Sequence, residues 1–311
     1  MKSFFSKLGS VLTAVRVWTV NLFTLLLWVY VVGGAIYLLS MRSPSVDPAG
    51  KVLILNPEGM VQDQEVFPEE FGFPFNMAAE NQIQSRDLIK VIRAAAADQD
   101  LAGILIDFSD TSFAGPSTAL NIAKELAALR EAGKQVVAYS EVLDTGAYLM
   151  AAQANEIYVH PSGAVAINGI GGYRDYTREL TENLKITIHN YSQGDYKSAV
   201  EGLTRTDMSD ADRLQREEMY GPIWASLKQR MAQGRGVKPE QIQHLADNFS
   251  VPMIDEAAYD GLAHAQEVGV ISGTLTFPEL RALMIERFGK SEEEEGDRET
   301  YPHISWQAYM S

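Results

Sequence analysis

The sequence has no cysteine among its 311 residues. This absence excludes disulfide bonds, thiolate metal sites and cysteine nucleophiles, but it is neutral on the cellular compartment. Histidine is nearly as scarce, because the chain has only five, and no two of them have the spacing of metal ligands. We therefore expect no bound metal and no other cofactor.

Acidic residues are absent from the first 42 positions and abundant after them. Residues 43–311 hold 22 basic and 41 acidic residues, a net charge of −19. A surface with this charge repels phosphate backbones, so we expect no nucleic-acid partner. The apolar fraction of the whole chain is 46%, which is enough for a folded core in a chain of this length.

An uncharged apolar run near the N-terminus predicts a transmembrane helix. Residues 17–39 contain no charged side chain. At about 1.5 Å per residue, a helix of this length crosses a bilayer core of ~30 Å. Trp18 and Tyr37 lie near its ends, where aromatic rings favour the membrane interface. A cleaved signal peptide is the alternative, but its apolar core usually has only about 7–15 residues, and no good cleavage site follows this run.

The distribution of basic residues around this run predicts its orientation. Lys2, Lys7 and Arg16 precede the run, whereas only Arg42 closely follows it. Because positive residues favour the cytoplasmic side, residues 1–16 are expected in the cytoplasm. We therefore predict a single-pass protein of the inner membrane whose acidic main domain lies in the periplasm or its equivalent.

The remaining sequence alternates between apolar strand patterns and helix patterns. Residues 40–50 contain proline and glycine and predict a linker, followed by a main domain over residues 51–290. The expected strands are residues 51–55, 103–108, 135–139, 156–160 and 186–191. A long loop is expected over residues 56–81, and Ser85 and Ser117 are candidate N-caps of helices. This alternation is typical of an α/β domain with a mainly parallel sheet covered on its faces.

The C-terminal part changes character twice. A mostly helical pattern extends to about residue 289, and residues 291–295 form an acidic linker. An apolar and aromatic pattern then resumes near residue 301. We expect residues 291–311 to comprise this linker and the start of a second half that the sequence does not contain.

Four short stretches together carry a resemblance to a known family. They are residues 100–104 (DLAGI), 152–157 (AQANEI), 196–201 (YKSAVE) and 207–209 (DMS). In combination they resemble the N-terminal half of the long, double-domain form of the signal peptide peptidase A (protease IV) family. The resemblance implies a fold similar to crotonase and Clp protease, built from β-β-α units. It also implies an oligomeric membrane peptidase, a tetramer in the long form, that degrades cleaved signal peptides with a serine–lysine dyad.

The same resemblance assigns Lys197 as the general base and places the nucleophilic serine in the absent second half. A lysine can accept a proton from a serine hydroxyl only when it is neutral, so its pKa must fall from about 10.4 toward neutrality. We expect residues 194–199 to follow a strand and to open a helix, whose positive end would favour the neutral amine in a sheltered cleft. Asp195 would oppose this effect. The alternative is a solvent-facing lysine at the start of a helix.

Thr145 occupies the position at which single-domain relatives carry their serine. Threonine nucleophiles usually depend on their own N-terminal amine, so helix capping is the alternative role for this residue. The loop of residues 113–117 could donate a backbone N–H to an oxyanion. Pro116 has no N–H, so Gly115 is the candidate donor of this loop. A simple turn is the alternative there. Ser198 adjoins Lys197, but neighbouring helical side chains diverge by about 100°.

These observations predict a membrane-anchored serine–lysine peptidase subunit that hydrolyses little or nothing on its own. The main alternative is a non-catalytic, crotonase-like scaffold that is anchored in the membrane and binds a partner. An acyl-CoA enzyme is a weaker alternative, because the chain has a membrane helix and lacks a basic nucleotide-binding patch. The glycines of residues 169–172 lack the strand and the later acidic residue of a dinucleotide fingerprint, so NAD is not expected.

Overall fold

The computed structural model describes residues 2–40, 47–64, 81–250, 260–292 and 298–311. The chain forms two units, one comprising the N-terminal residues up to 46 and the other residues 47–310. Residues 41–46 of the predicted linker (residues 40–50) and most of the acidic stretch 291–295 lie outside the described residues. Each unit is considered by itself.

The N-terminal unit is one long helix, α1 (Lys2–Ser40). Within it Val15–Tyr37 is long and apolar enough to cross a membrane, and none of this stretch is buried in protein. This extent agrees with the predicted span of residues 17–39. A helix of this length and composition is compatible with a membrane anchor or with a signal sequence.

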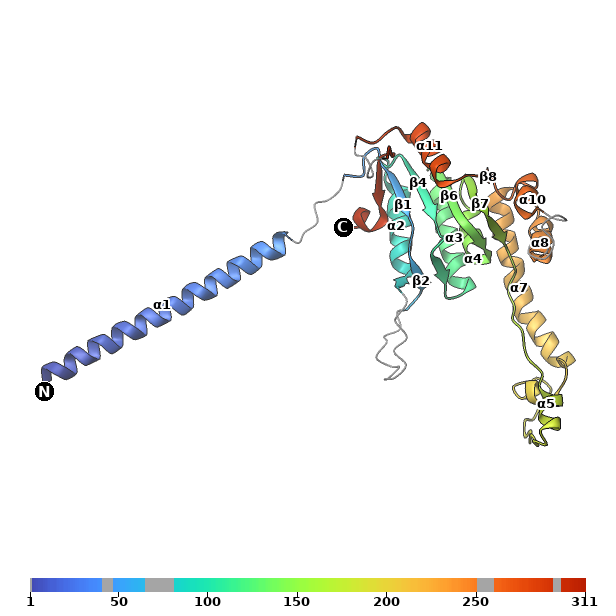
Figure 1. Ribbon diagram of the computed structural model, residues 1–311, viewed down its shortest axis with the longest axis horizontal. Coiled ribbons are helices and arrows are strands. Elements are labelled where there is room, and N and C mark those ends of the chain that lie inside the picture. Colours follow the sequence, from blue (N-terminus) through green and yellow to red (C-terminus); the bar gives the residue numbers. More distant parts are fainter. Residues whose placement is uncertain (1, 41–46, 65–80, 251–259, 293–297) are drawn as a thin grey trace. The chain divides into compact units, whose positions relative to one another are not determined.

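A six-stranded parallel sheet forms the centre of the second unit (Figure 1). Its strands are β1 (Val52–Leu55), β4 (Gly103–Asp107), β6 (Val136–Asp144), β7 (Glu156–Ala166), β8 (Gly273–Thr274) and β9 (His303–Ser305). They are arranged in the order β8-β7-β6-β4-β1-β9, and every neighbouring pair is parallel. The predicted mainly parallel α/β class is confirmed by this pairing.

A second, three-stranded sheet lies at the carboxyl ends of the first strands. It consists of β2 (Gly59–Gln62), β3 (Gln82–Gln84) and β5 (Thr111–Phe113) in the order β3-β2-β5, again parallel. Strands β1 and β2 precede helix α2 (Ser85–Ala97), and strands β4 and β5 precede helix α3 (Pro116–Glu131). These are the β-β-α units that the resemblance implied.

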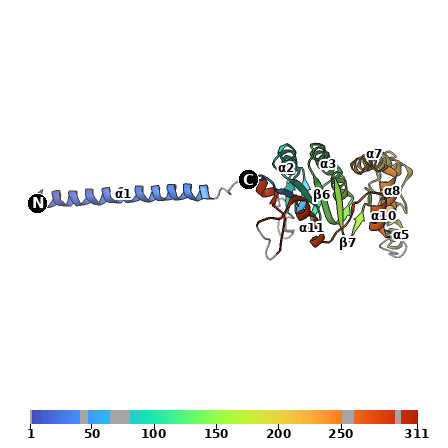
Figure 2. The same ribbon diagram turned by 90° about the horizontal axis from the view of Figure 1, so that it is seen from above.

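Helices cover both faces of the large sheet (Figure 2). The other helices of this unit are α4 (Thr145–Ala151), α5 (Arg178–Asn183), α6 (Glu201–Thr204), α7 (Asp210–Arg235), α8 (Pro239–Asn248), α10 (Gly261–Glu267), α11 (Phe277–Phe288) and α12 (Trp306–Tyr309). Helices α2, α3, α4 and α7 pack on one face, and α11 packs on the other. Gly234 lets α7 approach the end of α4 closely, because a Cβ there would lie 2.3 Å from the Ala152 carbonyl oxygen.

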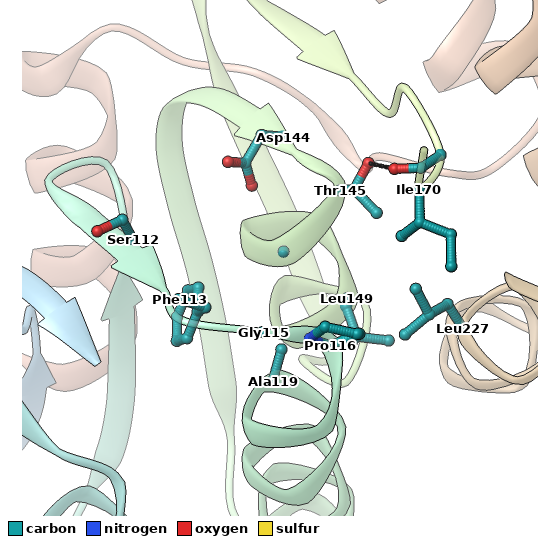
Figure 3. A pocket seen from close by; sticks show the side chains of 12 residues that line it. Ser112, Phe113, Gly115, Pro116, Ala119, Asp144, Thr145, Leu149, Ile170 and Leu227 are labelled. Carbon is teal, nitrogen blue, oxygen red and sulfur yellow. Dashed lines mark hydrogen bonds between the residues drawn. The ribbon is translucent and has the colours of Figure 1, made fainter. Parts of the chain in front are cut away.

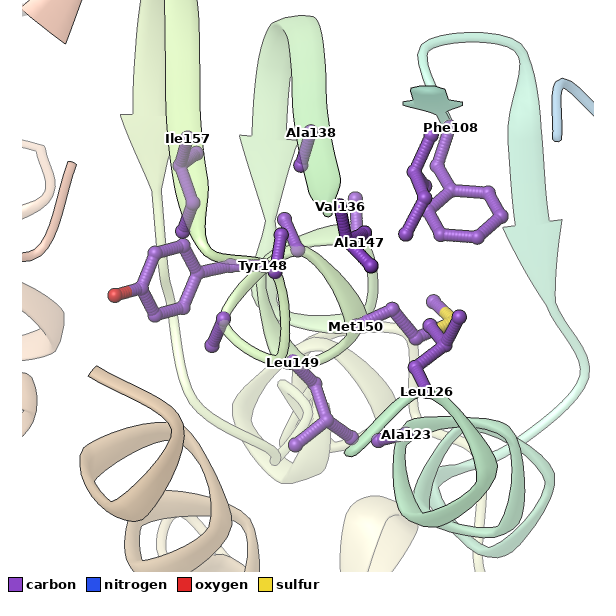
Figure 4. Packing of buried hydrophobic residues seen from close by; sticks show 14 of the residues in the cluster. Phe108, Ala123, Leu126, Val136, Ala138, Ala147, Tyr148, Leu149, Met150 and Ile157 are labelled. Atoms are coloured by element: carbon purple, nitrogen blue, oxygen red, sulfur yellow. The ribbon is translucent and has the colours of Figure 1, made fainter. Parts of the chain in front are cut away.

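Alternating side chains of the strands explain the two apolar layers. Leu53 and Ile104 belong to the cluster with α2, α3 and α4, whereas their neighbours Val52 and Leu105 pack against α11. Period-two alternation with both faces buried makes such strands apolar throughout. Figure 4 shows the first layer where α4 meets α3, with Leu149 pointing toward Ala123. This packing holds the start of α4 in place at the end of β6.

Several predicted boundaries were wrong. Strand β2 lies within the expected loop of residues 56–81. The N-caps are Gln84 and Gly115, and the expected cap Ser85 instead donates its hydroxyl to the Asp63 carboxylate, 2.7 Å away. Ser117 lies inside α3.

Two longer segments also differ from the prediction. Residues 186–191, expected as a strand, are irregular. The closing residues 303–305, assigned to the start of another unit, pair in parallel with β1 and extend the sheet of this domain at its edge. Buried Tyr301 and Ile304 explain the second difference, because they complete the apolar layers on the two faces of that edge.

Candidate functional site

Lys197 lies in a long excursion between β7 and α7. This segment, residues 173–209, is called the arm here, and it lies at the N-terminal end of α7, away from the sheet (Figure 1). Lys197 is in a turn closed by its backbone N–H and the Gly194 carbonyl, 3.2 Å apart. The prediction that residues 194–199 open a helix was wrong, because the next helix, α6, begins at Glu201.

The side chain of Lys197 is exposed in the isolated chain. Its ammonium group forms no hydrogen bond or ion pair with any residue that the structure describes. The expected sheltered cleft around this amine is therefore not formed by the described part of the chain alone. The exposure arises because the flanking turn, rather than a packed helix, carries the residue.

The residues directly after Lys197 are held by a buried ionic cluster. The Asp212 carboxylate, with 3% of the residue exposed, accepts a hydrogen bond of 2.8 Å from the Ser198 hydroxyl. Arg174 and Arg216 also donate to this carboxylate, at 3.2 and 3.0 Å. Arg174 donates in addition to the backbone carbonyl of Ser198, at 2.5 Å. The loop is therefore tied to the first turn of α7 through both its backbone and a side chain.

The electrostatics of this cluster keep Asp212 ionised. Burial acts to raise the pKa of Asp212, but the hydrogen bonds from Ser198 and Arg216 and the charges of both arginines outweigh it and lower the pKa. Ser209 caps α7 by accepting from the Asp212 backbone N–H at 3.1 Å, and its hydroxyl donates to Glu201 at 2.5 Å. The arm thus has a well-connected base of paired charges next to the lysine turn.

The outer surface of the arm is unusually apolar. Its tyrosines stand out most, since Tyr173 and Tyr191 are fully or almost fully exposed. Other exposed large apolar side chains of the arm are Leu180, Leu184, Ile186, Tyr196 and Leu203. A concentration of exposed apolar side chains on one segment is typical of a surface that contacts another protein. Lys197 lies among these side chains in sequence.

A cavity of about 260 Å³ lies in the core part of the domain, between the end of β5 and the start of α4 (Figure 3). It is lined by Ser112, Phe113, Gly115, Pro116, Ala119, Asp144, Thr145, Gly146, Leu149, Gly169, Ile170 and Leu227. Thr145 and Gly115, which the sequence analysis singled out, are both in this lining. Lys197 is not, so the structure joins two of the three candidate residues and leaves the third on the arm.

Thr145 uses its hydroxyl to connect two loops. The hydroxyl donates to the Asn168 side-chain oxygen at 2.8 Å and accepts from the Asn168 backbone N–H at 3.1 Å. The Gly169 carbonyl is a second acceptor at 3.3 Å, along the dashed line in Figure 3. Asp144, the residue before it, caps α4 by accepting from the Ala147 N–H at 2.7 Å. No lysine, arginine or histidine lines the cavity to act as a base for Thr145.

Gly115 has an extended backbone, with φ −179° and ψ 166°, and precedes the first residue of α3. Its carbonyl accepts from Ala119 at 3.3 Å, which closes the first turn of that helix. Any residue type adopts this conformation, and a Cβ here would meet no atom within 4 Å. The space beside Gly115 is therefore free of protein atoms, so a ligand backbone can approach it closely.

The sequence analysis missed the arginine and aspartate of the ionic cluster. Arg174 and Asp212 lie 38 positions apart, and neither belongs to a local motif. Only the tertiary fold brings the start of the arm against the first turn of α7. Among the described residues, no group of three acidic, histidine or cysteine side chains is arranged to hold a metal ion.

Comparison with known proteins shows similarity to a peptidase family over nearly half of the chain. Residues 128–272, which contain both Thr145 and Lys197, match the model of peptidase family S49. Protease 4 of Salmonella typhi is 28% identical over 308 residues, covering 95% of this chain and 48% of that protein. Protease 4 of Haemophilus influenzae is 27% identical over 67% of this chain and 34% of its own length. The chain thus spans about half or a third of the length of these relatives.

More distant relatives extend the comparison. The chloroplastic serine protease SPPA of Arabidopsis thaliana is 22% identical over 77% of this chain and 32% of that protein. Among solved structures, a putative enoyl-CoA hydratase/carnithine racemase from Magnetospirillum magneticum is 15% identical, with a TM-score of 0.30 over 66% of this chain and 64% of that chain. A score this low carries no argument about function.

Proposed function

We propose that the chain is a member of peptidase family S49, in the signal peptide peptidase A group, and a peptidase subunit that supplies Lys197 as the general base of a serine–lysine dyad. The matching family model and the similarity to Protease 4 and SPPA support this proposal. The serine comes from a second half or subunit outside this sequence. In this proposal α1 anchors the subunit in the inner membrane, with residues 1–16 in the cytoplasm and the main domain in the periplasm. Its substrates are small apolar peptides such as cleaved signal peptides.

The observation that carries the proposal is a lysine without a partner on a loop that is held firmly. The buried Asp212 carboxylate and Arg174 hold the loop beside Lys197, at Ser198, while the amine itself forms no hydrogen bond or ion pair with the described residues. A surface lysine with no function needs no such fixed backbone. A lysine that must meet a serine from another polypeptide does need it, because catalysis depends on near-contact positioning.

The apolar surface of the arm supports the second part of the proposal. Side chains such as Tyr173, Tyr191 and Ile186 would be covered when a serine-bearing half or another copy of the chain packs on the arm. Covering the arm would also remove water from the lysine, and loss of water favours the neutral amine. A homo-oligomer, expected as a tetramer from the long form of the family, fits this role of the arm.

The proposed hydrolysis can be followed through the proton that Lys197 accepts and returns. The neutral Lys197 amine takes the proton of the incoming serine hydroxyl as its oxygen attacks the peptide carbonyl. The resulting ammonium group returns the proton to the leaving amine, and an ester to the serine remains. Water, deprotonated by the same amine, hydrolyses this ester and restores the serine. Backbone N–H groups of the serine-bearing partner would stabilise the oxyanion.

The test is a reconstitution. The full chain, purified in detergent, is assayed with a fluorogenic apolar peptide, alone and with the serine-bearing half of Protease 4 from Salmonella typhi. We expect little turnover by the chain alone and clear turnover by the assembly. Lys197→Gln should lower kcat of the assembly by about 10²–10⁴-fold, the usual contribution of a general base. Lys185→Gln, which removes another lysine of the arm, should have little effect.

The same assay distinguishes the alternative function. If the assembly forms and Lys197→Gln leaves turnover unchanged, the chain is a non-catalytic, membrane-anchored scaffold. The tied hydroxyl of Thr145 and the exposed amine of Lys197 favour that alternative over a self-contained peptidase. Strong turnover by the isolated chain, abolished by Thr145→Ala, would contradict the external origin of the serine.

A further inference from the structure

The cavity beside Thr145 is separate from the arm and has no part in the proposed dyad. We propose that it is a peptide-binding site that holds, without cleaving it, an extended segment combining an apolar side chain with a neighbouring basic group. The inference rests on the proposed function only for the choice of peptides as ligands. Four features of the described residues support it: the lining, the open edge of β5, the charge of the rim and the state of Thr145.

The lining favours one apolar side chain. Figure 3 shows Ile170 and Leu227 close to each other on one side of the cavity, with Phe113 on the other. The volume of about 260 Å³ lies below the range of ~300–1,000 Å³ that is typical of pockets for whole drug-sized ligands. It suits the insertion of part of a longer ligand, such as one leucine or phenylalanine side chain.

The open edge of β5 can bind the backbone of such a ligand. Strand β5 is at the edge of its sheet, and the N–H of Ala114 donates to Val61 of β2 at 3.0 Å. Because alternate residues of a strand point to opposite sides, the N–H and C=O of Phe113 face away from β2. Among the described residues, none accepts from the N–H of Phe113 or of Gly115. A peptide added along this edge would place alternate side chains over the cavity.

The rim is negatively charged. Asp144 lines the cavity, and no lysine, arginine or histidine does. Asp144 therefore places a carboxylate at the edge of an apolar cavity. A peptide with a basic residue beside an apolar one complements both, and signal peptides join a basic region to an apolar core.

The absence of cleavage follows from the hydrogen bonds already formed. The Thr145 hydroxyl donates to Asn168 and accepts from the same residue, so it is engaged as both donor and acceptor. The cavity lining offers no basic side chain to take its proton. A peptide bound at β5 would therefore meet no activated nucleophile.

Binding is measured on the full detergent-solubilised chain without a serine-bearing partner. The probe is the fluorescein-labelled peptide Lys-Ala-Leu-Ala-Ala, followed by fluorescence anisotropy. We expect saturable binding that weakens about tenfold or more when Leu is replaced by Ser or Lys by Glu, because each change removes one of the two complementary features. The Ile170→Asp variant should weaken binding to the same degree. Its control, Leu214→Asp, changes an exposed leucine 13 positions before Leu227 on α7 and should leave binding unchanged.

A second measurement does not depend on any variant being folded. Hydrogen exchange of the unaltered chain should slow at the amides of Phe113 and Gly115 when the peptide is added. Absence of binding, equal binding by Ile170→Asp, equal binding of the Glu peptide, unchanged exchange at both amides or cleavage of the probe would each overturn the proposal. Because the readout is binding to the lone chain, these outcomes are independent of the turnover test for Lys197.

Discussion

The core around Thr145 and the arm around Lys197 belong to the same domain but are built in opposite ways. Around Thr145, side chains such as Tyr148 and Leu149 are completely buried, and the cavity wall is shaped by packing. Around Lys197, large apolar side chains are exposed and the local structure depends on one buried carboxylate, Asp212. The comparison indicates that buried packing shapes the core, whereas the arm leaves much of its apolar surface uncovered in this chain.

The largest expected difference is in stability. Ile104→Ala, in the centre of the sheet, should lower the free energy of unfolding by about 2–5 kcal/mol, because a fully buried side chain is lost and a cavity remains. Ile186→Ala, on the exposed arm, should change it by less than about 0.5 kcal/mol. Urea denaturation followed by circular dichroism measures both. Equal losses would show that the arm is as well packed as the core.

Asp212→Asn should affect the arm and spare the core. The substitution removes the charge that pairs with Arg174 and Arg216, and a loss of about 1–3 kcal/mol is expected, confined to the arm. Hydrogen exchange in residues 194–205 should become faster, while exchange in β4 and β6 stays unchanged. In the reconstituted assembly kcat should fall with little change in KM, since the lysine is no longer positioned. Asp210→Asn, an exposed neighbour in the same turn of α7, is the matched control.

Thr145→Val should lower the stability of the domain by a smaller amount, and the loss should be located in the core. It removes the hydroxyl that bridges to Asn168, and a loss of about 1 kcal/mol in the free energy of unfolding is expected. Thr145→Ser keeps both hydrogen bonds and should retain most of the stability. Chemical denaturation of the three proteins side by side tests this. If the valine variant is as stable as the original, the bridge is not what holds this turn.

The smallest expected effect is a difference in pH dependence between the two regions. The pKa of Asp212 is lowered, so its stabilisation is complete above the ordinary aspartate value of about 3.9 and is lost as the pH falls through the lower folded value. Burial raises the pKa of Asp107, so its ionisation destabilises the fold as the pH rises from about 3.9 through the higher folded value.

The two aspartates should therefore respond oppositely to substitution by asparagine. Asp107→Asn should raise the free energy of unfolding at pH 7, and this gain should vanish as the pH falls below about 3.9. Asp212→Asn should lower it at pH 7, with the loss diminishing in acid. Denaturation curves between pH 3 and pH 7 check both signs. Parallel curves for the two variants would contradict the assigned electrostatics.

Much of the core could be predicted from sequence, because its signals are local. The apolar runs that became β1 and β4 and the helical spacing of α2 depend on neighbouring residues only. The strand predicted over residues 186–191 was wrong because a short apolar pattern is a strand only when it pairs with another strand, and these residues pair with none of the described strands. Strand β2 was missed inside a proline-containing loop because its partners, β3 and β5, lie far away in the sequence.

The sequence by itself determined the parallel α/β class, the long apolar helix, the acidic surface and the motif around Lys197. Each of these features depends on composition or on residues that lie close together in the sequence. Only the tertiary structure decided that Thr145 and Gly115 share one cavity, that Asp212 and Arg174 hold the lysine loop, and that Lys197 lies apart from both. The physical reason is distance along the chain. Contacts between residues many positions apart depend on how whole helices and strands pack, and local sequence patterns do not predict this packing.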